Sequence, residues 1–218
     1  MTKAILFDLW DTIIFVCGAH PVIQVYERLG LKERDMYEFA QNLERSMMMR
    51  EYTTMEEMFV PLLKIYKIQE HPQLLFDLTE IWKKNINSIF FPPDMDEVLK
   101  GLRKKFKLVL LTNIDNFALK YVKYRYNIQE YFDIIVASCE VGMAKPDQAI
   151  FNLPLRKLQI KPEEAYICGD NVKNDISVPR EMGMKTIFLD MKNVSKGGES
   201  DHIVHNVKEF IELLKRLD

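Results

Sequence analysis

The stretch that decides the fold is Ile5-Leu6-Phe7-Asp8-Leu9-Trp10-Asp11-Thr12, close to the start of the chain. Its unbroken apolar run leads directly into Asp8, and such a run is typical of a buried parallel strand. Asp8 would then stand at the carboxyl end of the strand, where open α/β sheets bind their ligands. An aspartate at this place can act as a nucleophile, bind a metal ion or cap a helix, and this stretch alone leaves the three alternatives open.

The length and composition of the chain set broad limits. It has 218 residues, of which 48% are hydrophobic and 28% charged, and its formal net charge is −2. This length allows one domain with a large insertion or two small domains. The weak net charge gives no indication of a nucleic acid or an anionic membrane as partner. The sequence lacks a membrane-spanning apolar run of about 18 residues and a signal-peptide pattern, so we expect a cytoplasmic monomer or homodimer.

Residues 17–89 show the periodicity of helices. Apolar residues recur there at helical spacing in four runs, beginning at Val22, Met36, Met55 and Leu74. Such spacing is typical of helices that bury one face, and we find no convincing strand in this segment. We therefore predict a helical cap domain over residues 17–89, inserted into a core formed by residues 1–16 and 90–218.

After this segment, strands and helices alternate. The predicted strands are Leu108–Leu111, Ile134–Ala137, Ala165–Cys168 and Thr186–Leu189. Alternation of this kind predicts parallel βαβ units, so we expect a Rossmann-like, doubly wound and mainly parallel α/β core. Residues 90–94 are interpreted as a linker, with a helix over Met95–Lys105 that Asp94 caps. Asn174 and Asp175 are placed in a turn.

Three predicted strands end in polar residues, namely Asp8, Thr112-Asn113 and Gly169-Asp170. In a doubly wound sheet these strand ends meet in one crevice. A carboxylate there can attack an electrophile, and Asp8 with Asp170 can bind Mg²⁺, which prefers oxygen ligands. Thr112 can contact phosphate oxygens, and Lys145, from a loop between the last two strands, adds a positive charge. Phosphoryl transfer needs mainly such positioning and charge neutralisation.

These segments together resemble the haloacid dehalogenase superfamily of aspartate-nucleophile hydrolases. The resemblance is carried by residues 5–12, by Leu110-Leu111-Thr112-Asn113, by Lys145-Pro146-Asp147 and by residues 169–175. The helical segment falls where that family has its cap domain. The resemblance implies a mobile cap, dependence on Mg²⁺ and a covalent aspartyl intermediate.

The resemblance also implies roles for single residues. Asp8 would be the nucleophile. The carboxylates of Asp8 and Asp170 and the backbone carbonyl of Trp10 would bind Mg²⁺. The transferring group would be held by Thr112, Asn113 and Lys145, and Asp175 would support the lysine or the metal. The substrate would be a small molecule, in the phosphatases of the family a phosphate ester.

One position departs from the phosphatases of the family. They carry a second aspartate two residues after the nucleophile, and that residue protonates the leaving group, whereas this chain has Trp10 there. Asp11 should point elsewhere, because neighbouring side chains on an extended segment alternate in direction. The family's 2-haloacid dehalogenases have an aromatic residue at this position, so a dehalogenase is one alternative. A weakly catalytic phosphate-binding protein is the other. Asp11 or a residue of the helical segment could replace the missing acid.

Overall fold

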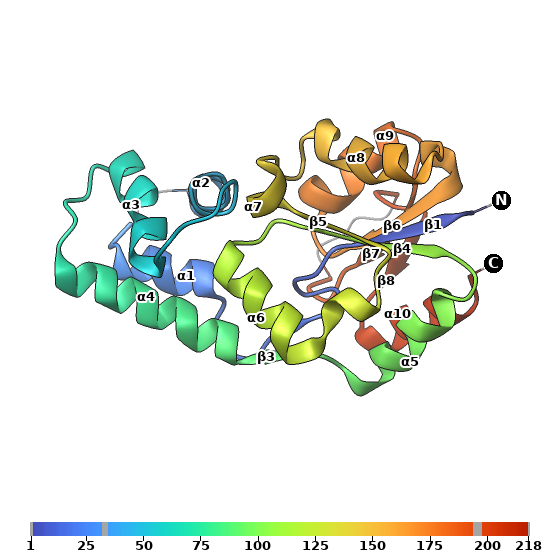
Figure 1. Cartoon of the computed structure of the whole chain (residues 1–218), viewed down its shortest axis with the longest axis horizontal. Coiled ribbons are helices and arrows are strands. Elements are labelled where there is room, and N and C mark those ends of the chain that lie inside the picture. The colour runs from blue at the N-terminus through green and yellow to red at the C-terminus, as the bar shows by residue number, and fades with distance from the viewer. Residues whose placement is uncertain (1, 32–34, 194–197, 218) are drawn as a thin grey trace.

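A computed structural model describes residues 2–31, 35–193 and 198–217 of the chain. Figure 1 shows a sheet covered by helices on both faces and, at one end of it, a group of further helices. Within the described residues the main sheet has the strand order β5-β4-β1-β6-β7-β8, and every neighbouring pair is parallel. The strands are β1 (Ala4–Phe7), β4 (Lys107–Thr112), β5 (Ile134–Ala137), β6 (Ala165–Gly169), β7 (Lys185–Leu189) and β8 (His202–Val204). The predicted parallel α/β fold is confirmed.

Strand β1 lies inside the sheet, and its alternate side chains enter two different cores. Ile5 and Phe7 pack in a cluster that also contains residues of α5, α6 and α10, whereas Ala4 and Leu6 pack in a cluster with residues of α8. Burial on both faces explains why this strand is an unbroken apolar run. The helices of this part are α5 (Pro93–Leu102), α6 (Asn116–Tyr126), α7 (Ser138–Val141), α8 (Gln148–Leu158), α9 (Val178–Glu181) and α10 (Val207–Lys215). Three short helices accompany them, η1 (Ile128–Glu130), η2 (Pro162–Glu164) and η3 (Val172–Ser177).

The described residues between Pro21 and Asn87 form helices and no strand. They are α1 (Pro21–Arg28), α2 (Met36–Met47), α3 (Met55–Ile65) and α4 (Pro72–Asn87). Side chains of Asp35, Thr54 and His71 accept backbone N–H groups at the starts of α2, α3 and α4, which is a common way to begin a helix. Among the described residues no helix is both long and apolar enough to cross a bilayer.

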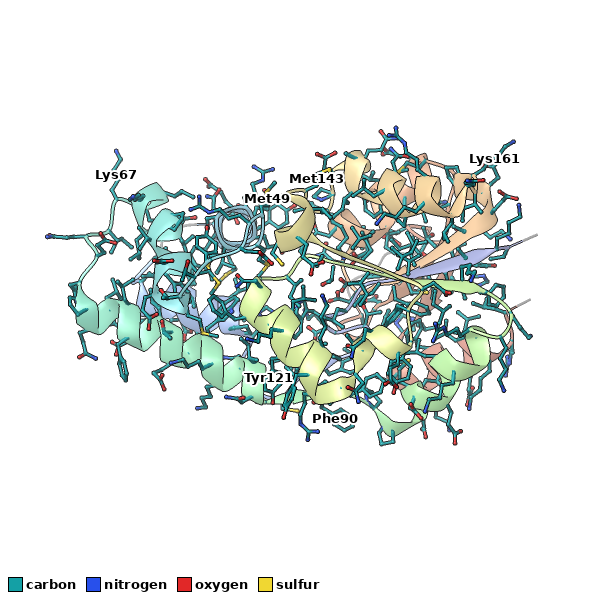
Figure 2. The ribbon with its side chains drawn as sticks, in the orientation of Figure 1. Met49, Lys67, Phe90, Tyr121, Met143 and Lys161 are labelled. Carbon is teal, nitrogen blue, oxygen red and sulfur yellow. The ribbon has the colours of Figure 1, made fainter. Side chains whose placement is uncertain are left out.

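A short antiparallel ribbon joins the two parts of the molecule. Its strands are β2 (Phe15–Val16) and β3 (Ile89–Phe90), with Phe15 opposite Phe90. Figure 2 shows Met49 and Met143 close to the boundary between the two parts, while Lys67 and Lys161 mark opposite ends of the molecule. The chain thus enters and leaves the group α1–α4 through adjacent strands.

Two local predictions were wrong, and three short strands were missed. Helix α5 begins at Pro93, without a side-chain cap from Asp94, because proline has the right φ for a first helical turn and needs no hydrogen-bond acceptor there. Asn174 and Asp175 lie in the π-helix η3 and not in a turn. The strands β2, β3 and β8 were not predicted, because two or three residues are too few for a recognisable pattern.

Candidate active site

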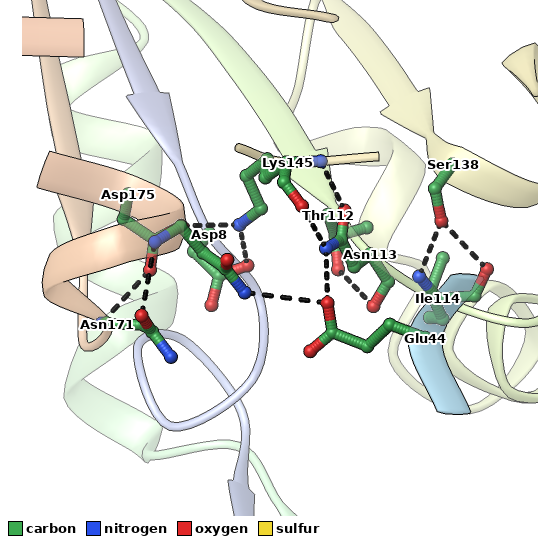
Figure 3. A network of polar contacts seen from close by, with 10 residues as sticks. Asp8, Glu44, Thr112, Asn113, Ile114, Ser138, Lys145, Asn171 and Asp175 are labelled. Atoms are coloured by element: carbon green, nitrogen blue, oxygen red, sulfur yellow. Dashed lines mark hydrogen bonds and ion pairs between the residues drawn. The ribbon is translucent and has the colours of Figure 1, made fainter. Parts of the chain in front are cut away.

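Asp8 directly follows β1, and the sheet fixes its position. Its backbone N–H donates to the carbonyl of Cys168 at 2.9 Å, which continues the pairing of β1 with β6. The Nζ of Lys145 donates to Oδ1 of Asp8 and to Oδ1 of Asp175, each at 2.6 Å (Figure 3). Asp8, Lys145 and Asp175 are 5%, 4% and 1% exposed. One buried cation therefore bridges two buried carboxylates.

Burial and charge act in opposite directions on these groups. Burial raises the pKa of Asp8 to about 7, although the neighbouring Lys145 lowers it. Burial alone would lower the pKa of Lys145, but the carboxylates of Asp175 and Asp8 outweigh it and hold that pKa above its usual value. Lys145 therefore stays charged at neutral pH, as a buried charge can when it is paired.

Asp175 is held against the end of β6 by contacts that need a glycine. The backbone N–H of Asn171 donates to its Oδ2 at 3.1 Å. A Cβ added at Gly169 would lie 2.3 Å from the Cβ of Asp175. Any other residue at 169 would displace this carboxylate, so the Gly169-Asp170 sequence provides both the close approach and the next carboxylate.

Asp8, Asp170 and Asp175 form a group of carboxylates whose ligand oxygens lie within 4.8 Å of one another. Burial, followed by the charges of Asp8 and Asp175, holds the pKa of Asp170 well above its usual value. Carboxylates that repel one another in this way are a suitable ligand set for a hard cation. The residues present therefore fit Mg²⁺. Trp10 lines the same cavity.

Asn113 connects the end of β4 with the loop of Lys145. Its Oδ1 accepts the backbone N–H of Lys145 at 2.8 Å, and its Nδ2 donates to the carbonyl of Lys145 at 3.0 Å. The side chain of Thr112 is fully buried, and its hydroxyl lies 3.4 Å from the carbonyl of Asn113. Asn113 belongs to the described residues that line the cavity, and Thr112 does not.

A cavity of about 660 Å³ lies between the strand ends and the helices α1, α2 and α4. On the sheet side the polar residues are Asp8, Asn113 and Asp170 at strand ends, Lys145 from a loop and Asp175 from η3. The helical side is mostly apolar, with Val22, Ile23, Met36, Ala40, Met48 and Ile86. A ligand in this cavity would therefore meet charges at one end and an apolar wall at the other.

Glu44 of α2 is a site residue that the sequence analysis missed. Its Oε2 accepts a hydrogen bond from Nδ2 of Asn113 at 2.8 Å (Figure 3), and Nδ2 of Asn174 lies 3.5 Å away. Burial raises the pKa of Glu44, while the hydrogen bond from Asn113 lowers it to a lesser extent. A signal was available, because Glu44 follows Ala40 by four positions and so falls on the apolar face of its helix.

The position of Asp11 corrects a prediction. Its φ is +53°, a left-handed conformation that aspartate tolerates better than most residues. The segment after Asp8 is therefore a turn and not extended, and Asp11 lines the cavity. Its charge contributes to the raised pKa of Asp170.

Comparisons with known sequences identify a family. The sequence model of haloacid dehalogenase-like hydrolases matches residues 2–183. Two proteins named glyceraldehyde 3-phosphate phosphatase are similar over their full length. The one from Methanothermobacter thermautotrophicus is 25% identical, with 98% of this chain and 100% of that protein covered. The one from Methanopyrus kandleri is 28% identical, with 100% and 99% covered. The ribulose-1,5-bisphosphate 5-phosphatase of Halopiger xanaduensis is 26% identical, but the match spans only 61% of this chain and 60% of that protein.

Solved structures share the fold. A HAD phosphatase from Thermococcus onnurineus superposes with a TM-score of 0.63 at 22% identity, over 98% of both chains. A 2-haloacid dehalogenase from Pseudomonas syringae superposes with a TM-score of 0.65 at 22% identity, over 99% of both chains. At this identity the likeness is evidence for the fold alone. From the family match over most of its length and from the fold, the chain belongs to the haloacid dehalogenase-like hydrolase family.

Proposed function

We propose that the protein is a Mg²⁺-dependent phosphatase that hydrolyses a small phosphate ester through a phosphorylated Asp8. The observation that carries the proposal is the buried arrangement of Asp8, Lys145 and Asp175 beside Asp170, at the end of a cavity large enough for a small molecule. The full-length relatives named phosphatases support the same reaction class. A cytoplasmic location and the state as monomer or homodimer stay predictions from the sequence.

The first step would be an attack by the Asp8 carboxylate on phosphorus. The bond between phosphorus and the leaving oxygen breaks, and an acyl phosphate forms on Asp8. Lys145 would hold Asp8 in place and bind a phosphoryl oxygen, while Asp175 orients Lys145 through the 2.6 Å contact. Asn113, which lines the cavity, would bind a further phosphoryl oxygen, and a role of Thr112 in holding the phosphoryl group stays a prediction from the family resemblance. Water then attacks phosphorus, and the Asp8 carboxylate is restored.

Asp8, Asp170 and the backbone carbonyl of Trp10 would hold Mg²⁺ in this proposal. When bound, the ion would neutralise negative charge on the carboxylates and on the phosphoryl oxygens. The positions of Asp8 and Asp170 suit this role, because the two residues directly follow the adjacent strands β1 and β6 and their carboxylate oxygens lie close together. A solved structure of similar fold, at 22% identity, is described as a complex with magnesium and inorganic phosphate.

The helices α1–α4 would act as a cap over the site. Two adjacent strands, β2 and β3, connect them to the sheet, so a small change there would move the cap as a unit. The cap reaches the core through Glu44 and through Tyr52, whose backbone exchanges two hydrogen bonds with the side chain of Asn116 at 3.1 and 3.0 Å. A closed cap would exclude water during phosphoryl transfer.

Trp10 favours one alternative, a 2-haloacid dehalogenase. In that reaction Asp8 would displace a halide, which needs no proton on leaving. Asp170 argues against it, because a carboxylate beside Asp8 makes Asp8 harder to ionise unless a cation lies between them.

The test is a panel of phosphate esters and 2-haloacids, incubated with the purified protein in Mg²⁺ and in excess chelator. We expect phosphate release with Mg²⁺ and almost none with chelator. Asp8→Asn should lower the rate by about 10⁴–10⁶-fold, the range seen when a nucleophile and its partners are removed. Asp94→Asn, at an exposed position, is the matched control and should be unchanged.

Each alternative has its own outcome. Halide release that persists in chelator would establish the dehalogenase and overturn the phosphatase. Phosphate binding without release from any ester would indicate a binding protein.

A further inference from the structure

Loss of the leaving group requires a proton donor that the strand ends do not provide. An alkoxide is a poor leaving group, and a positioned acid typically contributes about 10²–10⁴-fold. Asp8 is the proposed nucleophile, and Lys145 pairs with both Asp8 and Asp175. Asp170 belongs to the proposed metal site. The indole of Trp10 can donate a hydrogen bond but cannot transfer a proton at neutral pH.

Two further ionisable groups that line the cavity, Asp115 and His20, already accept hydrogen bonds. Asp115 accepts two backbone N–H groups on Oδ1 and the indole N–H of Trp82 on Oδ2. His20 accepts the backbone N–H of Val22 on Nδ1, and burial lowers its pKa. Asp11 also lines the cavity, and the variant Asp11→Asn described below distinguishes it from Glu44.

Glu44 has the right place and chemistry. In an in-line displacement the leaving oxygen departs on the side of phosphorus that faces away from Asp8. The Glu44 carboxyl comes from α2, and Figure 3 shows it facing the group of Asp8, Lys145 and Asn113 from the helical side. Its hydrogen bond to Asn113 places it next to the proposed phosphate site. Burial raises its pKa, which favours the protonated form that an acid needs.

We propose that Glu44 is the general acid and base of this enzyme, supplied by the helical cap in place of the carboxyl that Trp10 replaces. This inference rests on the proposed phosphatase function. In the first step Asp8 attacks phosphorus, and the electron pair of the breaking P–O bond takes the proton of Glu44, which releases an alcohol. In the second step the Glu44 carboxylate takes a proton from water as the water oxygen attacks phosphorus. The bond to Asp8 then breaks, and phosphate leaves.

With Glu44 as the acid, proton transfer to the leaving group depends on closure of the cap. Because Glu44 belongs to α2 and the nucleophile to β1, acid and nucleophile meet only when the cap lies against the sheet. An open enzyme would then be unable to protonate a leaving group, and substrates that fail to hold the cap closed would react slowly.

The test compares Glu44→Gln with the unaltered protein on two esters of similar size, phenyl phosphate and 4-nitrophenyl phosphate. Glutamine can still accept the hydrogen bond from Asn113 but cannot transfer a proton. The kcat/KM for phenyl phosphate should fall by about 10²–10⁴-fold. The kcat/KM for 4-nitrophenyl phosphate should fall much less, because nitrophenoxide leaves without a proton. A burst of nitrophenol and trapped phospho-Asp8 should then appear, since the second step has lost its base.

The control is Glu38→Gln, the same change at an exposed position of α2, and it should behave like the unaltered protein. If Glu44→Gln does not fold, Glu44→Ala with added formate is the second test, and formate should restore part of the phenyl phosphate rate. An equal loss on both esters, with no accumulation of phospho-Asp8, would mean that Glu44 only positions Asn113 and would overturn the proposal. The proposal would also be overturned if Asp11→Asn, and not Glu44→Gln, lost activity selectively on phenyl phosphate and accumulated phospho-Asp8. An unaltered protein that hydrolyses neither ester would refute the proposed function itself.

Discussion

The two sides of the cavity are built differently. On the sheet side, buried charges satisfy one another, with Lys145 at 2.6 Å from both Asp8 and Asp175. On the helical side, α1, α2 and α4 provide a mostly apolar wall and the partly buried carboxyl of Glu44. The sheet side is suited to a fixed reaction centre, because removal of any member leaves a buried charge without its partner. The helical side is suited to selection of the leaving group.

The largest expected effect is the loss of folding stability in Lys145→Met, on the sheet side of the cavity. This substitution leaves the carboxylates of Asp8 and Asp175 buried and unpaired, which typically costs about 3–5 kcal/mol. Urea unfolding in chelator measures this loss. Lys123→Met is the matched control, because Lys123 pairs with Glu140 at a partly exposed site on the surface, and surface pairs contribute under about 1 kcal/mol.

The pH dependence of that loss has a defined sign. Without Lys145, the Asp8 carboxyl ionises less readily in the folded protein than in the unfolded chain, and burial already raises the pKa of Asp8 to about 7. Protonation therefore favours the folded variant, so the cost of Lys145→Met should shrink as the pH falls from 8 to 5. An equal cost at both values would contradict the view that Lys145 compensates buried charge.

A smaller effect is expected from Gly169→Ala. The new methyl group would lie 2.3 Å from the Cβ of Asp175 and would push that carboxylate away from Lys145. Overpacking of this kind typically costs about 1–3 kcal/mol, and kcat should fall together with stability. Gly101→Ala is the control, since nothing lies within 4 Å of its added methyl group and it lies in α5. That change should stabilise the protein by about 0.5–1 kcal/mol. Similar melting temperatures for the two variants would refute the close approach at Gly169.

The smallest effect should come from a substitution in the apolar wall that α1, α2 and α4 form, and it should concern substrate binding. Met36 lines the cavity and lies on α2. Met36→Ala removes apolar contact with the leaving group, which should raise KM by roughly 10-fold, while kcat changes little. Steady-state kinetics on phenyl phosphate measure both constants. A fall in kcat with an unchanged KM would mean that the wall takes part in the reaction and would remove the contrast between the two sides.

The same contrast explains what could be predicted from the sequence. Buried parallel strands are long apolar runs, so the places of Asp8, Asn113 and Asp170 at strand ends followed from the pattern around them. Lys145 was predicted as a cation from a neighbouring loop and Asp175 as a turn residue, with a supporting role that the family resemblance implied, and the structure brings both to Asp8. Because the strands are parallel neighbours, the residues that follow them lie at the same edge of the sheet.

The features that escaped prediction depend on exact backbone geometry or on contacts between distant segments. The turn that exposes Asp11 to the cavity needs a positive φ that no pattern of apolar residues reveals. Glu44 contacts Asn113, 69 positions away along the chain, and only the docking of α2 against the sheet creates that contact. The early start of α5 reflects the two possible roles of proline, which can end a helix or begin one.

The central claim is that Asp8 accepts the phosphoryl group, and trapping the intermediate tests it most directly. The unaltered protein is mixed with 4-nitrophenyl phosphate and Mg²⁺ and quenched in acid within milliseconds to seconds, and its peptides are then sequenced by mass spectrometry. We predict phosphate on the peptide that contains Asp8, located on Asp8 itself, and none when Mg²⁺ is replaced by chelator. Steady hydrolysis of the ester with no label on Asp8 in Glu44→Gln, the variant in which the intermediate should accumulate, would contradict the account.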